Sequence, residues 1–206
     1  MNLATRRLTV TGPAGTLEAA VNEPLDAAPR GVAVVCHPHP QHGGTMDNKV
    51  AQTLARAFVQ LGWRAVRFNF RGVGASTGAW DAGQGEIDDA LAVVADQRDA
   101  ALPFALAGFS FGGYVASQAA RRLADAGHAA DRLVLVGPAT QNFDVAPVPP
   151  GTLVIHGEAD EVVPLSATLD WARPQHLPVV VVPGVGHFFH GQLSLLKSIV
   201  VGACGA

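Results

Sequence analysis

Short apolar segments of strand length alternate with helical segments along most of this chain, and this alternation constrains the fold more than any other feature. Several of the apolar runs are continuous, as expected of strands that are buried on both faces. We predict strands at residues 31–36, 63–70, 102–107, 132–136, 152–155 and 178–182, and helices at 47–61, 86–99, 113–124, 164–171 and 187–201. Strands that alternate with helices form a mainly parallel sheet with right-handed crossovers. The sequence therefore predicts an α/β, doubly wound fold with helices on both faces of the sheet.

The beginning of the chain and its composition complete this picture. Strand-like runs at residues 6–11 and 16–22 surround the turn cluster 12–15 and predict an opening hairpin. The 206 residues, 49% of them hydrophobic and 15% charged, show no boundary, so residues 1–206 are expected to form a single domain. The net charge is −3 without a basic patch, which argues against nucleic-acid and membrane partners. With no signal-peptide core or membrane span, we expect a cytoplasmic protein; a homodimer is left open.

A serine lies where a predicted strand turns into a predicted helix. The segment Gly108-Phe-Ser-Phe-Gly112 follows an apolar run and precedes an alanine-rich run of good helix formers. Strand, sharp turn and helix are the context of a nucleophile elbow, which lifts a serine hydroxyl clear of the sheet. A second Gly-x-Ser-x-Gly match, around Ser76, follows several loop residues and precedes no helix. This difference in context favours Ser110 as the nucleophile.

A serine nucleophile needs a base, and the base needs an acid that orients it. Asp160 follows the strand at 152–155, and His187 follows the strand at 178–182. Both are expected at the sheet edge where parallel-sheet proteins collect their active sites. The order Ser110, Asp160, His187 is that of an α/β-hydrolase triad. The alternative candidates for the acid are Asp144, Glu158 and Glu161, and those for the base are His156 and His190.

The same edge should supply an oxyanion hole and a substrate pocket. One N–H donor is expected from Phe111, directly after the nucleophile. The second is expected from the loop after residues 31–36, where Pro38 and Pro40 lack an N–H and leave His39 first and Gln41 second. From their position near this edge, we expect these residues to line the substrate pocket: Gln41, Trp80, Phe109, Val162 and Phe188.

The histidines in the loop after residues 31–36 permit another interpretation. His37, His39 and His42 have a spacing that some metal hydrolases use for zinc. Such a site needs further ligands, which Asp160 and His187 would have to supply, and it leaves the strand–turn–helix context of Ser110 unexplained. We therefore predict neither a metal site nor a cofactor.

Several motifs together resemble the α/β-hydrolase superfamily over nearly the whole chain. More narrowly, residues 37–49 carry a His-Pro-His-Pro…Gly-Gly-Thr-Met-Asp-Asn-Lys signature similar to that of small bacterial serine hydrolases. Residues 70–78 resemble the loop after the fourth strand of that fold, and His-Gly-x-x-Asp-x-x-Val-Pro at 156–164 resembles its acid loop. The resemblance implies esterase-type hydrolysis with Ser110, Asp160 and His187 as the triad.

Many members of that superfamily cover the site with a helical lid after the sixth strand. Here the corresponding residues 137–151 contain four prolines, so we expect a loop and an open site. An open site suits small or short-chain acyl groups. The sequence thus predicts a lidless serine hydrolase that cleaves a small-molecule carboxylic ester. The alternatives are a thioesterase or peptidase with the same triad, a non-catalytic binding protein on this scaffold, and a metal-dependent hydrolase.

Overall fold

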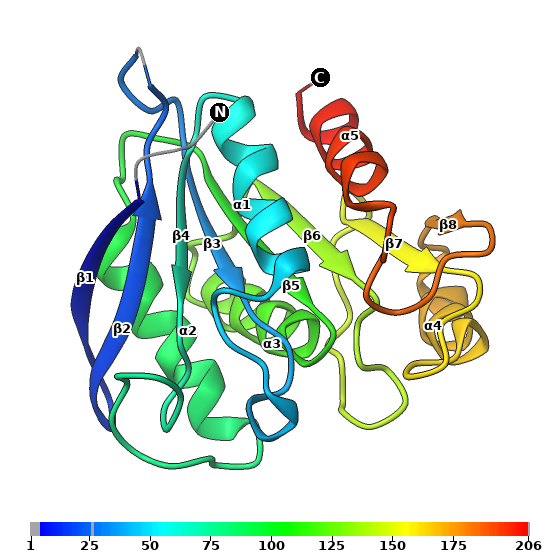
Figure 1. Ribbon diagram of the computed structural model, residues 1–206, viewed down its shortest axis with the longest axis horizontal. Helices are drawn as coiled ribbons and strands as arrows, with labels where there is room; N and C mark the ends of the chain where they lie inside the picture. Colours follow the sequence, from blue (N-terminus) through cyan, green and yellow to red (C-terminus); the bar gives the residue numbers. More distant parts are fainter. Residues whose placement is uncertain (1–4, 26, 206) are drawn as a thin grey trace.

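The computed structural model describes residues 5–25 and 27–205. One eight-stranded sheet forms its centre, in the order β1-β2-β4-β3-β5-β6-β7-β8 (Figure 1). The β1–β2 and β2–β4 pairs are antiparallel, and every other neighbouring pair is parallel. The strands are β1 (Thr5–Gly12), β2 (Gly15–Asn22), β3 (Val32–Cys36), β4 (Arg64–Phe68), β5 (Phe104–Phe109), β6 (Arg132–Val136), β7 (Leu153–Gly157) and β8 (Val179–Val182). The expected opening hairpin and mainly parallel sheet are confirmed.

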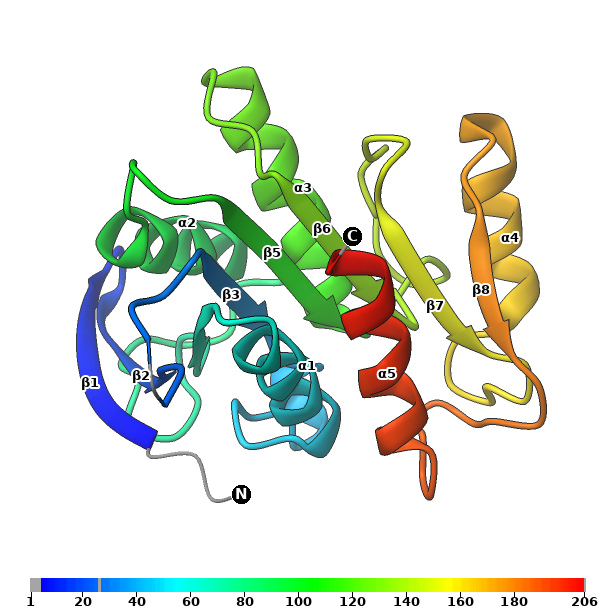
Figure 2. The same cartoon turned by 90° about the horizontal axis from the view of Figure 1, so that it is seen from above.

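Helices cover both faces of this sheet, as Figure 2 shows. Buried side chains of α1 and α5 pack on one face, and those of α2, α3 and α4 pack on the other. The helices are α1 (Lys49–Gln60), α2 (Gln84–Gln97), α3 (Phe111–Asp125), α4 (Leu165–Ala172) and α5 (Leu193–Cys204), with short 3₁₀ turns at Pro40–His42 and Arg173–Gln175. Within the described residues, no helix combines the length and the apolar character needed to cross a membrane.

Strand β3 shows why its sequence is apolar throughout. Val32, Val34 and Cys36 join the core beneath α2 and α3. Ala33 and Val35 point the other way and join the core beneath α1 and α5. Because successive side chains of a strand alternate between faces, a strand covered on both faces must be apolar at every position. The continuous runs in the sequence are therefore central strands, as predicted.

The segment between β6 and β7 contains no helix and leaves the site without a lid. Its backbone is held down on two helices. The Val145 carbonyl accepts a bond from Trp171 Nε1 of α4 at 3.0 Å, and the Ala146 N–H donates to Ser117 Oγ of α3 at 3.0 Å. Val145 and Ala146 are themselves buried. The segment packs against the body of the fold, which confirms the lidless architecture.

The last helix begins later than predicted. We expected a helix from residue 187 to 201, whereas α5 spans Leu193–Cys204. Phe189 (φ 52°) and Gly191 (φ 74°) have left-handed backbone conformations, which a right-handed helix does not accommodate. His187 and His190 therefore lie in a loop after β8, and the prediction that they belong to a helix is wrong.

Ser110 stands at the turn between β5 and α3. Its φ of 56° and ψ of −121° are uncommon for any residue other than glycine. Four backbone bonds hold this conformation. The Ser110 N–H donates to the Val136 carbonyl at 2.9 Å, and the Ser110 carbonyl accepts from the N–H groups of Gly113 at 2.8 Å, Ala139 at 3.2 Å and Tyr114 at 3.4 Å. The end of β6 thus fixes the turn from outside.

The two glycines of this turn are required by close backbone approach. A Cβ atom at Gly108 would lie 2.0 Å from the Gly112 carbonyl oxygen. A Cβ atom at Gly112 would lie 2.2 Å from the Cys36 carbonyl oxygen and 2.5 Å from that of His37. Backbone atoms cannot move aside as the end of a flexible side chain can. The start of α3 therefore packs directly against the ends of β3 and β5.

Gly112→Ala should lower the free energy of unfolding by about 2–3 kcal/mol, because the added methyl group overlaps fixed carbonyl oxygens. Gly151→Ala is the matched control, since its Cβ meets nothing within 4 Å. That variant should differ from the parent by less than about 0.5 kcal/mol. Urea unfolding of the three proteins checks both values. Equal stability of Gly112→Ala and Gly151→Ala would contradict this account of the turn.

Candidate active site

A buried carboxylate and a buried imidazole meet at the carboxyl edge of the sheet. Asp160 lies in the loop after β7, and His187 lies in the loop after β8. Asp160 Oδ2 is 2.6 Å from His187 Nδ1, and both side chains are almost fully buried. Because a carboxylate only accepts, Nδ1 carries the proton of this bond and Nε2 remains available as a base.

Further donors keep Asp160 ionised. Its Oδ1 accepts from the N–H groups of Val162 at 2.9 Å and Val163 at 2.8 Å. Burial favours the protonated acid, but the bonds from His187 and these N–H groups outweigh it, so the pKa of Asp160 lies below its ordinary value. His156 lies 3.4 Å from Oδ2 through Nε2 and also contacts the Val163 carbonyl at 2.9 Å. The loop after β7 is thus built around one carboxylate.

The surroundings of His187 connect it to the turn that carries Ser110. Its ring lies 4.8 Å from the ring of Phe109, the residue before Ser110. Gly137, directly after the carbonyl that binds the Ser110 N–H, would place a Cβ 3.4 Å from both the His187 ring and Asp160 Oδ2. The ends of β5, β6, β7 and β8 therefore bring Ser110, Asp160 and His187 to one place.

The rival acids and histidines are placed differently. Asp144, Glu158, Glu161 and His190 are exposed to solvent. His156 is fully buried and bonds to backbone and to Asp160, as described above. Among these candidates, only Asp160 is a buried acid in contact with His187.

The second serine match has a structural role. Ser76 is 7% exposed, and its hydroxyl donates to the Asn69 carbonyl at 2.7 Å and accepts from the Glu18 N–H at 2.9 Å. Both bonds tie its loop to the sheet, so this hydroxyl joins two backbone segments. Its environment differs from the strained turn of Ser110.

The backbone N–H groups of Phe111 and His39 are the candidate donors of an oxyanion hole. Phe111 is the first residue of α3, where N–H groups have no partner within the helix. His39 is held between Pro38 and Pro40, and its carbonyl accepts from His42 at 3.1 Å and Gly44 at 3.0 Å. The Gln41 N–H, our second choice of donor, is bound to His39 Nδ1 at 3.2 Å. This engagement favours His39 over Gln41.

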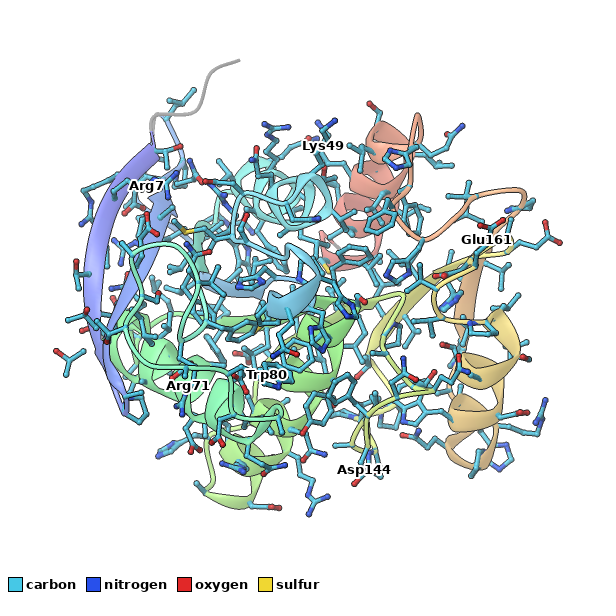
Figure 3. The ribbon with its side chains drawn as sticks, turned by 60° about the horizontal axis from the view of Figure 1, so that its bottom comes forward. Arg7, Lys49, Arg71, Trp80, Asp144 and Glu161 are labelled. Carbon is cyan, nitrogen blue, oxygen red and sulfur yellow. The ribbon has the colours of Figure 1, made fainter. Side chains whose placement is uncertain are left out.

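Aromatic side chains cluster around these donors. The His39 ring contacts those of Trp80 (4.7 Å), Phe111 (5.1 Å) and Phe143 (5.8 Å). Trp80 lies near the centre of this edge in Figure 3. Sequence reasoning missed Phe143, which comes from the loop after β6; its position after a strand was the available signal. The cluster forms a half-buried apolar wall beside the start of α3.

The remaining pocket candidates divide into two groups. Val162 and Phe188 are 48% and 44% exposed beside the Asp160–His187 pair, and Gln41 is exposed on the other loop. Phe109 is fully buried, so the expectation that it touches substrate is wrong. Side chains of β5 alternate between covered faces, and that of Phe109 lies beneath His187. It supports the imidazole from below.

His37 is a structural residue. It is fully buried, with Nδ1 2.6 Å from the Pro38 carbonyl and Nε2 3.2 Å from the Phe70 N–H. A carbonyl requires a protonated Nδ1, and an N–H donor requires an unprotonated Nε2, so both nitrogens are occupied and unavailable to a metal ion. Burial lowers the pKa of His37 to about 4. Within residues 5–25 and 27–205, no three His, Cys, Asp or Glu side chains gather as a metal site would require.

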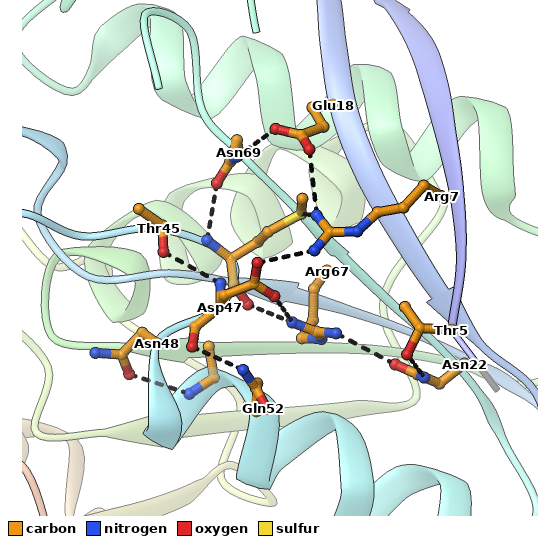
Figure 4. Close-up of polar contacts among 12 residues, drawn as sticks. Thr5, Arg7, Glu18, Asn22, Thr45, Asp47, Asn48, Gln52, Arg67 and Asn69 are labelled. Atoms are coloured by element: carbon orange, nitrogen blue, oxygen red, sulfur yellow. Dashed lines mark hydrogen bonds and ion pairs between the residues drawn. The ribbon is translucent and has the colours of Figure 1, made fainter. Parts of the chain in front are cut away.

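The second half of the signature segment anchors the loop of His39 to the sheet (Figure 4). Asp47 pairs with Arg7 of β1 and with Arg67 of β4, both at 2.9 Å. The Met46 N–H donates to Asn69 Oδ1 at 2.8 Å, and Asn48 caps α1. These contacts attach the far end of the loop to β1 and to the end of β4.

A strained serine beside a buried acid–histidine pair, on this strand order, is the arrangement of an α/β serine hydrolase. Comparison of the sequence with protein families leads to the same class. The chain belongs to the serine aminopeptidase (S33) family, whose model matches residues 27–151. That match includes Ser110 and His39 and ends before Asp160 and His187. The assignment of the last two residues therefore depends on their geometry.

Individual relatives agree with this family. An α/β serine hydrolase without lid from Xanthomonas campestris is 40% identical, with a TM-score of 0.89 over 98% of this chain and 94% of its own. An α/β serine hydrolase homologue from Coxiella burnetii is 37% identical, with a TM-score of 0.83 over 98% of both chains. An uncharacterised protein of Rickettsia prowazekii is 30% identical over 86% of this chain and 79% of its own.

The burial of His37 should make stability depend on pH. Its pKa is about 4 in the folded protein and 6.5 ordinarily. The contribution of neutral His37 to the free energy of unfolding is therefore fully present above pH 6.5 and is lost as the pH falls towards 4. The loss amounts to about 3 kcal/mol. His37→Asn, which cannot titrate, should be less stable at pH 7, and the gap to the parent should shrink between pH 6.5 and 4. Urea unfolding at several pH values measures this gap.

The exposed His128 provides the control. His128→Asn should differ from the parent by less than about 0.5 kcal/mol at pH 7, because its side chain is exposed. A gap for His37→Asn that stays constant between pH 6.5 and 4 would show that the folded protein tolerates a charged His37.

Proposed function

We propose that this protein hydrolyses carboxylic esters with small or short-chain acyl groups through an acyl-enzyme on Ser110. The observation that carries the proposal is the 2.6 Å bond between Asp160 and His187 at the edge where Ser110 stands in a strained turn. An orienting acid, a base and a raised hydroxyl are the parts that serine acyl transfer needs.

In the first half of the reaction, Ser110 Oγ attacks the acyl carbon and His187 Nε2 takes its proton. Asp160 holds the imidazole in the tautomer that leaves Nε2 free, and it stabilises the imidazolium that forms. The N–H groups of Phe111 and His39 bind the oxyanion. His187 then returns the proton to the leaving alcohol.

In the second half, water replaces the alcohol. His187 removes a proton from this water, whose oxygen attacks the acyl carbon of the Ser110 ester. The bond from the acyl carbon to Ser110 Oγ then breaks, His187 returns the proton to Oγ, and the acid is released. The same oxyanion donors serve this step. Every proton is carried by His187, so the proposed cycle uses no cofactor and no metal ion.

Three features support a small, uncharged acyl group. The segment after β6 packs on α3 and α4, which leaves no lid to enclose a long chain. The wall beside the oxyanion donors is formed by aromatic rings. Glu86, at the start of α2 after Trp80, is fully buried and uses its oxygens to accept from Asp81 and Gly83 N–H groups. It is therefore not free to bind a charged substrate.

Peptide cleavage is the second candidate, because the family is described as serine aminopeptidases. An aminopeptidase must bind the ammonium group of its substrate, and the exposed Asp144, next to Phe143, is a carboxylate suited to this. Comparing p-nitrophenyl acetate, the matched thioester and alanine p-nitroanilide separates the activities. We expect the highest kcat/KM for the ester; faster cleavage of the anilide would favour the peptidase.

Ser110→Ala should reduce hydrolysis of p-nitrophenyl acetate by at least about 10⁴-fold with an unchanged fold. It should also abolish labelling by a fluorophosphonate, because the labelled oxygen is gone. Ser76→Ala is the matched control: it should cost about 1–3 kcal/mol of stability through its two lost bonds and still be labelled. Activity that survives in Ser110→Ala, or requires a metal ion removable by chelator, would refute the mechanism.

Asp160→Asn tests the orienting acid. The amide can present an N–H to His187 and favour the wrong tautomer, so kcat should fall roughly 10⁴-fold. Glu158→Gln, an exposed neighbour in the same loop, should reduce kcat less than threefold. Burst kinetics with p-nitrophenyl acetate measure both. Comparable losses in the two variants would argue against Asp160 as the specific partner.

A further inference from the structure

A groove of about 550 Å³ lies between the loops that follow β7 and β8. His187 forms part of its lining, together with Glu161 and Val162 from one loop and Phe188 and His190 from the other. The groove is open to solvent and continuous with the histidine of the proposed triad.

The strand order determines on which side of the nucleophile this groove lies. The oxyanion loop of His39 follows β3, which borders β5 on one side. The groove follows β7 and β8, which lie on the other side of β5, beyond β6. In Figure 3, Trp80 of the aromatic wall lies near the centre of this edge and Glu161 lies at its margin. The groove therefore lies on the β7–β8 side of Ser110, whereas His39 and Trp80 of the aromatic wall come from the loops after β3 and β4 on the other side of β5.

The chemistry of acyl transfer indicates which part of the substrate lies on the His187 side of Ser110. In acyl transfer, the histidine that took the serine proton returns it to the leaving oxygen. The leaving oxygen must therefore lie within hydrogen-bond distance of His187, and the alcohol attached to it must extend along the surface next to that ring. The groove is the hollow that this surface provides.

The lining offers an apolar contact surface. Val162 and Phe188 are large apolar side chains that remain 48% and 44% exposed. The Phe188 ring is oriented by an edge contact with His187 (5.1 Å, 84°) and lies 5.8 Å from His190. A held but exposed ring is suited to stack on an aromatic group or to cover an aliphatic one.

The lining also has a definite charge. Among the described residues, those that line the groove include the Glu161 carboxylate and no lysine or arginine. Glu158, in the same loop, accepts from the Gly184 N–H of the opposite wall at 2.9 Å and adds a second negative charge nearby. An anionic group in this groove is repelled, and a cationic one is attracted.

We propose that this groove binds the alcohol part of the substrate and selects an apolar, aromatic alcohol that is neutral or positively charged. This inference rests on the proposed ester hydrolysis at Ser110. It adds that selectivity for the alcohol is separate from selectivity for the acyl group, because the two parts contact different walls.

Acetate esters of phenols test the charge preference. The neutral phenyl ester, a meta-carboxylate and a meta-trimethylammonium derivative all form the same acetyl-enzyme. Differences in kcat/KM, divided by each spontaneous hydrolysis rate, then report on the alcohol alone. We expect the cationic ester to exceed the anionic ester, and Glu161→Gln to reduce that ratio roughly fivefold at low ionic strength. Asp125→Asn, which removes the same charge at the far end of α3, should keep the parent ratio.

The apolar surface is tested with the same acyl group and two alcohols. Phe188→Ala should lower the ratio of kcat/KM for phenyl acetate over ethyl acetate roughly fivefold, because a stacking partner is removed. Leu195→Ala is the matched control, since Leu195 is 43% exposed on α5 and outside the groove lining. It should keep the parent ratio.

The outcomes separate this inference from the proposed function. If the parent forms an acetyl-enzyme on Ser110 but neither Glu161→Gln nor Phe188→Ala changes its ratio, the groove does not bind the alcohol and the esterase proposal stands. If no acetyl-enzyme forms from any ester, both proposals are refuted. A change in the predicted direction with both variants supports the groove as the alcohol site.

Discussion

The close approach of three backbone segments at the serine turn is the constraint on which the site depends. The end of β5, the start of α3 and the end of β3 meet with no room for a Cβ at Gly108 or Gly112. This packing forces the chain to reverse through Ser110 with a positive φ, and Val136 of β6 accepts the N–H that the turn exposes. It also places Phe111 at the first position of α3, where N–H groups have no partner within the helix. The proposed nucleophile and one proposed oxyanion donor are thus products of backbone packing.

The histidines show how environment separates chemically identical side chains. His37 binds backbone through both nitrogens and is kept neutral by burial. His156 is buried against the loop that it helps to shape. His187 bonds to a carboxylate through Nδ1, which leaves Nε2 free. His156 also keeps one ring nitrogen, Nδ1, without a hydrogen-bond partner, but that nitrogen is buried. His187 differs from both because its Nδ1 is bound to the Asp160 carboxylate at 2.6 Å, and this contact distinguishes a proposed base from a structural residue.

Much of the fold could be predicted because burial has a direct signature in sequence. Strands covered on both faces must be apolar throughout, so β3, β6 and β7 were recognisable, and their alternation with helices indicated the parallel sheet. The region from residue 187 to 192 was misjudged because left-handed conformations at Phe189 and Gly191 interrupt a helical pattern. The prediction that Phe109 lines the substrate pocket failed because the hydrophobic pattern of a strand does not tell which of its side chains the loop of His187 covers.

The sequence by itself determined the class of fold, the turn that carries Ser110, and the order of the proposed acid and base, since these depend on local patterns and on strand succession. Tertiary structure alone decided which residues meet. It brought Asp160 and His187 within 2.6 Å, engaged the Gln41 N–H so that His39 is favoured as the second oxyanion donor, and made Ser76 a structural hydroxyl. The reason is physical: contacts between distant segments, burial and hydrogen-bond partners arise only when strands far apart in the chain become neighbours. The five residues of the serine turn are recognisable in sequence, but their proposed role depends on the ends of β3, β6 and β8 that surround them.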